Sequence, residues 1–388
     1  MKNKVIPSLS LLLTVLLLLF SSSFSISSMS ACALTPDTQA LPALQGNFHG
    51  IATAKRPSSA NSKKSPTVAE QYRGLEVYAG GMPFGVKFLT EGVIIVGFHS
   101  VSSNGKTCTP AADAGLHVND IILQVNGTAL NGGADLCRLV EQSQGKPLDI
   151  LYSRGGVKHK TRLCPAYFEA EGRYSTGIYV RDSGAGIGTV TFIIPKTGAF
   201  AGLGHGICDA ESGALIPMQR GSVVDVTISG VVRGLAGSPG EVKGRFSSGK
   251  LGTLLGNTDC GVYGVLANLP SACQKKTVKI GLRDEICEGK ASVLCTVKGS
   301  IPKAYDIEIS QINPDATGNK CFTVKITDQE LIAQTGGIIQ GFSGSPIMQN
   351  GKLVGAVTHV LINDPTSGYG IFIENMLNAA NMPMAKPA

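Results

Sequence analysis

The chain has 388 residues, of which 43% are hydrophobic, so it is long enough to bury more than one core. The formal net charge of +7 comes from scattered Lys and Arg residues with no nucleic-acid-binding motif beside them, and we expect no nucleic-acid partner. The 49 Gly residues, the absence of Trp and many short runs of Val, Ile and Thr predict a mainly β protein.

The amino-terminal segment, residues 1–33, has the pattern of an export signal. Two lysines precede an apolar run from Val5 to Phe20, and the small residues Ala31-Cys32-Ala33 follow. The run is borderline for a membrane helix, which needs about 20 apolar residues, so a cleaved signal peptide and a retained membrane anchor both stay open. Residues 34–72 are polar and have no apolar period, which is typical of a linker.

The ten cysteines show no C-x-x-C pair, and their spacing resembles no small disulfide-stapled scaffold. They are spread along the chain as buried thiols or occasional disulfide bridges would be, and the sequence does not separate these two possibilities. We expect no metal and no cofactor.

A compact module is predicted over residues 73–166. Its most specific part is the segment from Ala111 to Leu116, with the sequence AADAGL, followed by DIILQVNG from Asp120 to Gly127. These letters predict a short helix of small residues, a strand and an Asn-Gly hairpin turn, and a further helix is expected over residues 133–141. The module resembles a PDZ domain of the protease-associated type.

The PDZ resemblance implies a groove in which an extended peptide adds as a strand beside the second strand of the domain. By position, the preceding Gly-rich loop would meet the peptide. A competing interpretation is that this loop is only a turn and that the module is a spacer. The predicted peptide-binding residues are Gly81, Met82, Pro83, Phe84, Gly85 and Val86.

The second half of the chain, residues 184–384, shows the short apolar runs and frequent turns of an all-β unit. Such a pattern fits barrels or a sandwich. Strands are predicted over residues 188–194, 223–228, 277–280, 293–297 and 322–326.

Two Gly-rich signatures in this half carry candidate chemistry. The first is GLGHGI, from Gly202 to Ile207, and the second is GFSGSP, from Gly341 to Pro346. The second matches the G-x-S-G-x-P pattern of chymotrypsin-like serine peptidases, in which a sharp bend exposes the hydroxyl of the serine, here Ser343. The backbone amides of Gly341 and Ser343 would form the oxyanion hole, where one donor contributes about 10²- to 10³-fold to the rate. Ser345 is the rival nucleophile.

A serine hydroxyl needs an imidazole within hydrogen-bond reach as base and a carboxylate that orients this imidazole. His205 lies 138 residues before Ser343, and the order of His before Ser fits two barrels that share a cleft. Two carboxylates are candidates for the orienting group, Asp328 and Asp259. The rival bases are His49, His99, His117 and His159, which lie in the predicted linker or PDZ module, and His359, which we expect to be a core imidazole on an apolar strand.

The run from Ile326 through the Ser343 signature to Gly370, together with the PDZ block and the His205 loop, resembles the stage IV sporulation protein B peptidases. The resemblance implies a PDZ domain followed by a chymotrypsin-like double β-barrel and a triad of His205, Asp328 and Ser343. It further implies an enzyme in the space between the forespore and mother-cell membranes. Such enzymes cleave their own amino-terminal region and a membrane-associated regulator of an intramembrane protease, leading to activation of a late mother-cell sigma factor.

Two other functions compete with this interpretation. A general quality-control peptidase would share the chemistry, but such enzymes usually carry the PDZ domain after the catalytic domain. A catalytically silent PDZ scaffold would keep the fold without turnover, since fold alone does not establish function.

Overall fold

The structure is a computed structural model, and it describes residues 70–209, 213, 215–273 and 276–380. The predicted export segment, residues 1–33, and nearly all of the predicted linker lie outside the described residues. In the part of the chain that is described, no helix is long and apolar enough to span a membrane. Strands make up most of the elements, as the composition predicted.

The first barrel of the peptidase is formed by strands that pair in a ring. The sheet runs in the order β11, β12, β15, β14, β13, β2, and β2 also pairs with β11, so the sheet closes on itself. Apolar side chains from these strands, Phe84 and Phe200 among them, fill its core. At the edge of this sheet, β1 (Glu76–Ala79) pairs with β11, and β16 (Thr277–Lys279) pairs with β1. The 3-10 turn η1 (Glu70–Tyr72) precedes β1. The barrel strands are β2 (Pro83–Phe98), β11 (Ile178–Ile193), β12 (Ala199–Gly202), β13 (Met218–Val232), β14 (Glu241–Thr258) and β15 (Gly261–Leu266).

The second barrel is closed in the order β17, β18, β19, β22, β21, β20. Alternate residues of its strands point inward, as in β18, where Tyr305, Ile307 and Ile309 are buried. Its strands are β17 (Gly289–Cys295), β18 (Lys303–Ser310), β19 (Phe322–Ile326), β20 (Pro346–Gln349), β21 (Lys352–Leu361) and β22 (Asp364–Phe372), and its helices are α4 (Gln329–Thr335) and α5 (Ile373–Ala379). The two closed rings confirm the predicted double β-barrel.

The PDZ module has a core of its own, to which Leu136 and Val140 of its longer helix contribute. The Asn-Gly turn forms as predicted, with positive φ at Asn126 (51°) and Gly127 (77°). The elements of the module are β3 (Val101–Ser103), β4 (Lys106–Cys108), α2 (Pro110–Asp113), β5 (Ile121–Val125), β6 (Thr128–Ala129), α3 (Gly133–Ser143), β7 (Leu148–Arg154), β8 (Val157–Leu163), β9 (Ala166–Phe168) and β10 (Arg173–Ser175).

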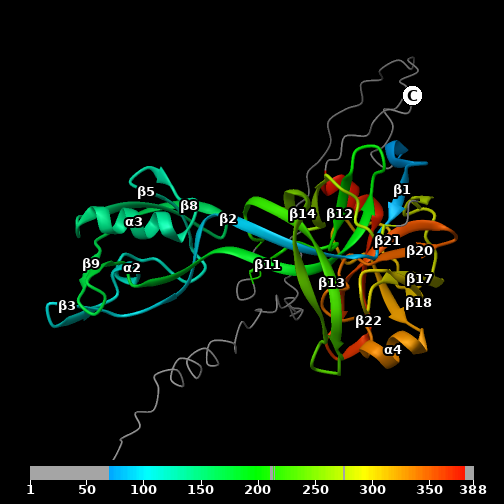
Figure 1. Cartoon of the computed structure of the whole chain (residues 1–388). Coiled ribbons are helices and arrows are strands. Elements are labelled where there is room, and N and C mark those ends of the chain that lie inside the picture. The colour runs from blue at the N-terminus through cyan, green and yellow to red at the C-terminus, as the bar shows by residue number, and fades with distance from the viewer. Residues whose placement is uncertain (1–69, 210–212, 214, 274–275, 381–388) are drawn as a thin grey trace, which may run out of the picture.

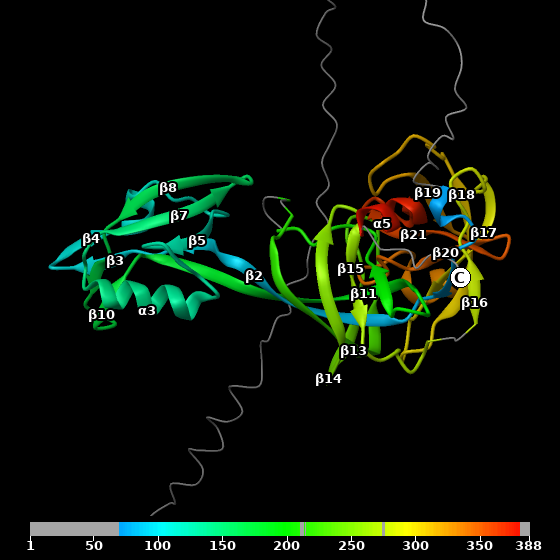
Figure 2. The same ribbon diagram turned by 90° about the horizontal axis from the view of Figure 1, so that it is seen from above.

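Two long strands, β2 and β11, run from one lobe of the molecule to the other (Figures 1 and 2). The first part of β2 pairs with β13 in the first barrel, and its second part pairs with β5 in the PDZ module. The module is therefore inserted between two strands of the first barrel rather than placed before the peptidase. This corrects the predicted boundaries of 73–166 and 184–384, because β1 and the start of β2 already belong to the barrel.

Candidate active site

The Ser343 loop precedes β20 in the second barrel and is fastened to β11 of the first. The hydroxyl of Thr189 donates to the carbonyl of Gly341 (2.8 Å), and that of Thr191 donates to the carbonyl of Gly344 (2.7 Å). Sequence analysis missed both threonines, although two hydroxyls at positions i and i+2 of an apolar strand share one face. These two bonds hold the nucleophile loop against the strand that pairs with β12.

The His205 loop follows β12 and reaches the second barrel. Leu203 and Gly204 both have a φ of 68°, and this left-handed turn ends the strand immediately before His205. A side chain on Gly204 would lie 3.0 Å from the Cγ2 atom of Thr358, so the turn packs closely on β21. His205 therefore lies where the two barrels meet.

The hydroxyl of Ser343 points at the same junction. It donates to the carbonyl of Thr358 (2.9 Å), and the next residue, His359, places its ring centroid 4.9 Å from that of His205. The structure thus brings the two predicted residues Ser343 and His205 to one place on β21. Ser345, the rival nucleophile, is fully buried in the core, which leaves Ser343 as the hydroxyl that a substrate can reach.

The imidazole of His205 is poised to act as a base. Its Nδ1 lies 2.8 Å from the carbonyl oxygen of Gly206. Because a carbonyl only accepts, Nδ1 carries the proton and Nε2 keeps its lone pair. Burial lowers the pKa of His205, and the hydrogen bond to Gly206 opposes this shift. The imidazole is consequently neutral at neutral pH, as a general base must be.

The predicted oxyanion hole keeps its donors available. The amides of Phe342, Gly344 and Ser345 donate to the carbonyls of Ile339, Val357 and Phe342, at 3.1, 2.8 and 2.9 Å. Within the described ranges the amides of Gly341 and Ser343 have no acceptor. In this loop, the two N–H groups of the predicted oxyanion hole are thus not used by any described acceptor.

Asp328 has a different place from the one that the family resemblance implies. Its carboxylate caps α4 by accepting from the amide of Leu331 (3.0 Å), and it also accepts from the amide of Asp306 (3.4 Å). Burial raises the pKa of Cys295 and Tyr305, that of Tyr305 to about 12, and the charge of Asp328 adds to both shifts. Asp328 thus lies with β17 and β18, and the described contacts do not bring it to His205.

The rival carboxylate, Asp259, lies on the turn between β14 and β15 beside the His205 loop. The neighbouring Asn257 accepts from the amide of Ile207 (2.8 Å), and the Asp259 carbonyl accepts from Asn319 (2.8 Å). The side chain of Asp259 is exposed. In the described chain neither carboxylate makes a hydrogen bond to His205.

The predicted peptide-binding loop requires a correction. Gly81, Met82, Pro83, Phe84, Gly85 and Val86 lie in the first barrel, where all six residues are buried. Phe84 is fully buried and packs edge-on against Phe200, and the carbonyl of Gly81 accepts from Thr296 (2.9 Å). These residues do not line a PDZ groove, because β2 passes through the barrel before it enters the module.

A different strand segment lies beside the helix of the PDZ module. Residues Ile178–Arg181 of β11 pair on one edge with β2. On the α3 side, the amide of Gly133 donates to Asp182 (2.9 Å). Among the described strands no other pairs with this segment, and Tyr179 is 58% exposed on it. The edge of β11 beside α3 is thus the place where a peptide could add as a strand.

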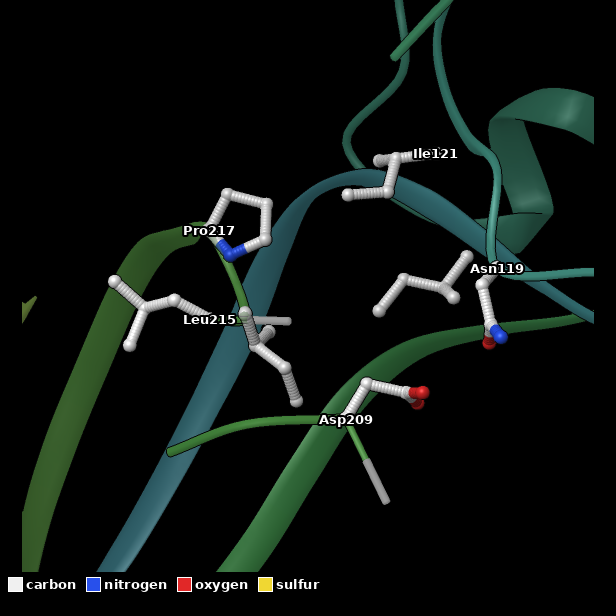
Figure 3. Close-up of a pocket in the computed structure, with 7 residues that line it drawn as sticks. Asn119, Ile121, Asp209, Leu215 and Pro217 are labelled. Carbon is white, nitrogen blue, oxygen red and sulfur yellow. The ribbon is translucent and has the colours of Figure 1, made fainter. Parts of the chain in front are cut away.

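A pocket lies where the PDZ module meets the segment that follows His205 (Figure 3). Asn119 and Ile121 come from the module, and Asp209, Leu215 and Pro217 come from the segment between His205 and β13. Described residues of the segment that follows His205 and residues of the PDZ module therefore line one pocket. Within the described ranges no group of His, Cys, Asp or Glu residues is placed to hold a metal ion.

Solved structures with some similarity include two proteases and a PDZ domain. The HtrA-type protease AlgW with a decapeptide is 16% identical, covering 52% of this chain and 53% of that chain, with a TM-score of 0.29. The active form of the Rv3671c protease from M. tuberculosis is 15% identical, covering 52% of this chain and 76% of that chain, with a TM-score of 0.26. The PDZ domain of an SdrC-like protein from Listeria monocytogenes is 23% identical, covering 23% of this chain and 87% of that chain, with a TM-score of 0.19. TM-scores this low support no statement about activity.

Sequence comparisons are more informative. The rat (Rattus norvegicus) 26S proteasome non-ATPase regulatory subunit 9 is 36% identical over 67 residues, and the match spans 16% of this chain and 30% of that protein. A PDZ domain model matches residues 101–154. The model of the SpoIVB peptidase S55 family matches residues 172–377, more than half of the chain and the whole of the site described above. The chain therefore belongs to the SpoIVB peptidase S55 family and carries a PDZ domain.

Proposed function

We propose that the chain is an exported serine endopeptidase that acts in sporulation, cleaving itself and a membrane-associated regulator of an intramembrane protease. The family supports a peptidase, and the signal pattern of residues 1–33 supports export. One observation carries the chemistry: the hydroxyl of Ser343 and the ring of His205 contact adjacent residues of β21, Thr358 and His359, near two amides that have no acceptor among the described residues. Acyl transfer by a serine requires a serine hydroxyl, an imidazole and free oxyanion donors close together, and this junction supplies these groups.

In the proposed reaction, Ser343 loses its proton to Nε2 of His205 as its oxygen attacks the peptide carbonyl. The amides of Gly341 and Ser343 stabilise the negative charge that develops on the carbonyl oxygen. The imidazolium then returns its proton to the leaving amine as the C–N bond breaks. Water, activated by the same imidazole, hydrolyses the acyl-enzyme.

The described conformation needs one rearrangement before it can react. The Ser343 hydroxyl donates to the Thr358 carbonyl, and this bond must break for the proton to reach His205. A serine held on a carbonyl suits an enzyme that is activated by its substrate or partner. The same observation favours the catalytically silent scaffold as the second candidate function, because such a chain would keep this bond permanently.

Substrate selection is assigned to the PDZ module. We propose that an extended segment of the regulator or of the chain's own amino-terminal region adds to the β11 edge beside α3. Export would confine both ligands to the space between the forespore and mother-cell membranes, and tethering would raise their effective concentration.

The test compares full-length wild-type chain with Ser343→Ala by intact mass and by cleavage of a short peptide identified from the self-cleavage site. Ser343→Ala should lower both activities by about 10⁴-fold or more while thermal unfolding stays unchanged, because only the attacking oxygen is removed.

Ser345→Ala is the matched control, since it removes the same atom from the same loop. It should retain cleavage, because the buried Ser345 hydroxyl has no hydrogen-bond partner among the described residues. A wild-type chain that cleaves neither itself nor the peptide would instead favour the silent scaffold.

A further inference from the structure

The loop between β18 and β19 lies across the junction of the two barrels, next to the reacting groups. Its residue Asn319 contacts both barrels. The side-chain amide of Asn319 donates to the carbonyl of Asp259 (2.8 Å) in the first barrel, and its own carbonyl accepts from the hydroxyl of Thr358 (2.9 Å) in the second. The carbonyl of Thr358 in turn accepts from the hydroxyl of Ser343. A single residue, Thr358, therefore separates this loop from the nucleophile.

The end of the loop, where Lys320 follows Asn319, is held in a defined place. The buried side chain of Asn375 in α5 donates to the carbonyl of Gly318 (2.9 Å), two residues before Lys320. The amide of Cys321, the next residue along the chain, donates to the carbonyl of Gly370 (2.8 Å) in β22. Because the backbone is fixed on both sides, Lys320 is presented to solvent from a rigid position.

Lys320 carries an exposed positive charge at the end of this loop. Its ammonium group lies over the ring of Tyr369, 5.1 Å from the centroid, in a cation–π contact. Lys303 packs on an aromatic ring in the same way, but it also forms an ion pair with Glu330. Within the described ranges Lys320 forms no ion pair. The charge of Lys320 is therefore available to a ligand.

The ammonium group of Lys320 is also close to the residues that surround the base. Tyr369, on which it lies, pairs with His359 across β22 and β21, and the ring of His359 lies 4.9 Å from that of His205, between centroids. Burial, with smaller contributions from His205 and Lys320, lowers the pKa of His359 to about 3. An extended peptide advances about 3.3 Å per residue, so a substrate cleaved at Ser343 brings a nearby residue within reach of Lys320.

We propose that Lys320 is a specificity-determining residue, which selects substrates that carry a carboxylate side chain, Asp or Glu, close to the scissile bond. This proposal rests on the proposed function and names the class of peptide that the serine site prefers. The carboxylate of the substrate accepts a charge-assisted hydrogen bond from the ammonium group of Lys320. Lys320 makes and breaks no covalent bond, so its effect appears in the choice between substrates.

The experiment measures cleavage of fluorogenic peptide libraries by the full-length chain, with Glu, Gln or Lys fixed in turn at each position around the scissile bond. At one position or more, the wild-type chain should prefer Glu to Gln by about 2- to 5-fold in kcat/KM, the size expected of an exposed ion pair, and should disfavour Lys. The preference should shrink as salt rises from about 0.05 M to about 0.5 M, because salt screens exposed charges.

Substitutions of Lys320 should change this preference according to their charge. Lys320→Gln should remove the preference, and Lys320→Glu should reverse it, so that Lys is preferred to Glu at the same position. The matched control is Lys87→Glu, which changes the net charge equally at another exposed lysine that lies over an aromatic ring, that of Phe246 (5.5 Å) in the first barrel. It should keep the wild-type preference. Equal preferences in Lys320→Glu and the wild type overturn the proposal.

Peptide binding to the Ser343→Ala chain gives a second readout that needs no turnover. By fluorescence anisotropy, this chain should bind the labelled Glu library more tightly than the Lys library, and adding Lys320→Glu should reverse the order. If the wild-type chain shows no cleavage that depends on Ser343, the proposed function fails, and the order of binding still decides the role of Lys320. Cleavage that depends on Ser343 but shows no preference due to Lys320 overturns this proposal alone.

Discussion

Gly344 is the residue at which the nucleophile loop comes closest to the first barrel. A side chain there would overlap the carbonyl oxygen of Thr189 and the amide nitrogen of Leu203, and its φ of 92° is strained for any other residue. Both neighbours are backbone atoms, of β11 and of the turn before His205, so neither can move aside as the end of a flexible side chain could. Gly344 therefore allows the Ser343 loop to pack closely against β11 and the His205 turn.

Gly344→Ala should lower the free energy of unfolding by at least about 1–3 kcal/mol and abolish peptide cleavage, because the loop must leave its place on β11. Thermal unfolding and the cleavage assay measure the two effects. Gly351→Ala is the control: its φ is 75°, but no atom lies within 4 Å of the added carbon. Equal effects of the two substitutions would contradict a tight contact at Gly344.

The pKa of His205 predicts the pH below which the enzyme loses activity. An exposed imidazole titrates near about pH 6.5. Burial lowers the pKa of His205 in the folded chain, so the base stays neutral below that pH. The acid limb of kcat/KM should therefore have its midpoint below 6.5. A midpoint at or above 6.5 would mean that a negative charge reaches His205 in the active enzyme.

The role of Asp328 as the N-cap of helix α4 can be tested by substitution. If Asp328 acts as the N-cap, Asp328→Ala should cost about 1 kcal/mol of stability, whereas Asp328→Asn and Asp328→Ser should keep most of it, since both residues are good caps. All three should cleave peptide normally per folded molecule. If Asn and Ser fold normally but have no activity, the carboxylate itself is required.

Much of the fold could be predicted from the sequence, because local patterns determine its elements. The alternation in residues 322–326 gave β19, and Asn126-Gly127 gave a hairpin turn. The insertion of the PDZ module was not predictable in this way. The 16-residue strand β2 has two apolar stretches, one in the barrel core and one in the PDZ core. Its sequence alone does not indicate that the two stretches belong to different cores.

The candidate site could be predicted in part. The Gly-rich motifs identified Ser343 and His205, because a sharp backbone turn with positive φ favours glycine. His359 was weighed and interpreted as a core residue, since its apolar strand is all that the sequence shows. Its contact with the ring of His205, 154 positions away, follows only from the tertiary structure.

Across the whole molecule, described residues that follow the His205 loop lie at the PDZ module. Leu215 and Pro217 line the same pocket as Ile121 of the module (Figure 3). The amide of Glu91 also donates to the carbonyl of Pro217 (3.0 Å), at the point where β2 leaves the barrel. We therefore predict that a change at this junction affects catalysis.

Leu215→Asp should disturb this junction, since it adds a charge beside Asp209. We expect kcat on a short peptide to fall by about 2- to 30-fold, which corresponds to a coupling energy of about 0.5–2 kcal/mol. Val157→Asp is the control, an exposed position on β8 that does not line the pocket. Equal activities of the two variants would show that the junction does not act on the base.

The central claim, that Ser343 is a nucleophile activated by His205, is tested most directly by covalent labelling of the full-length chain with a fluorophosphonate. Peptide mass mapping should find one adduct, on Ser343, and none in Ser343→Ala or His205→Ala. Ser345→Ala should label as the wild type does. An adduct on Ser345, or equal labelling of His205→Ala and the wild type, would contradict the account.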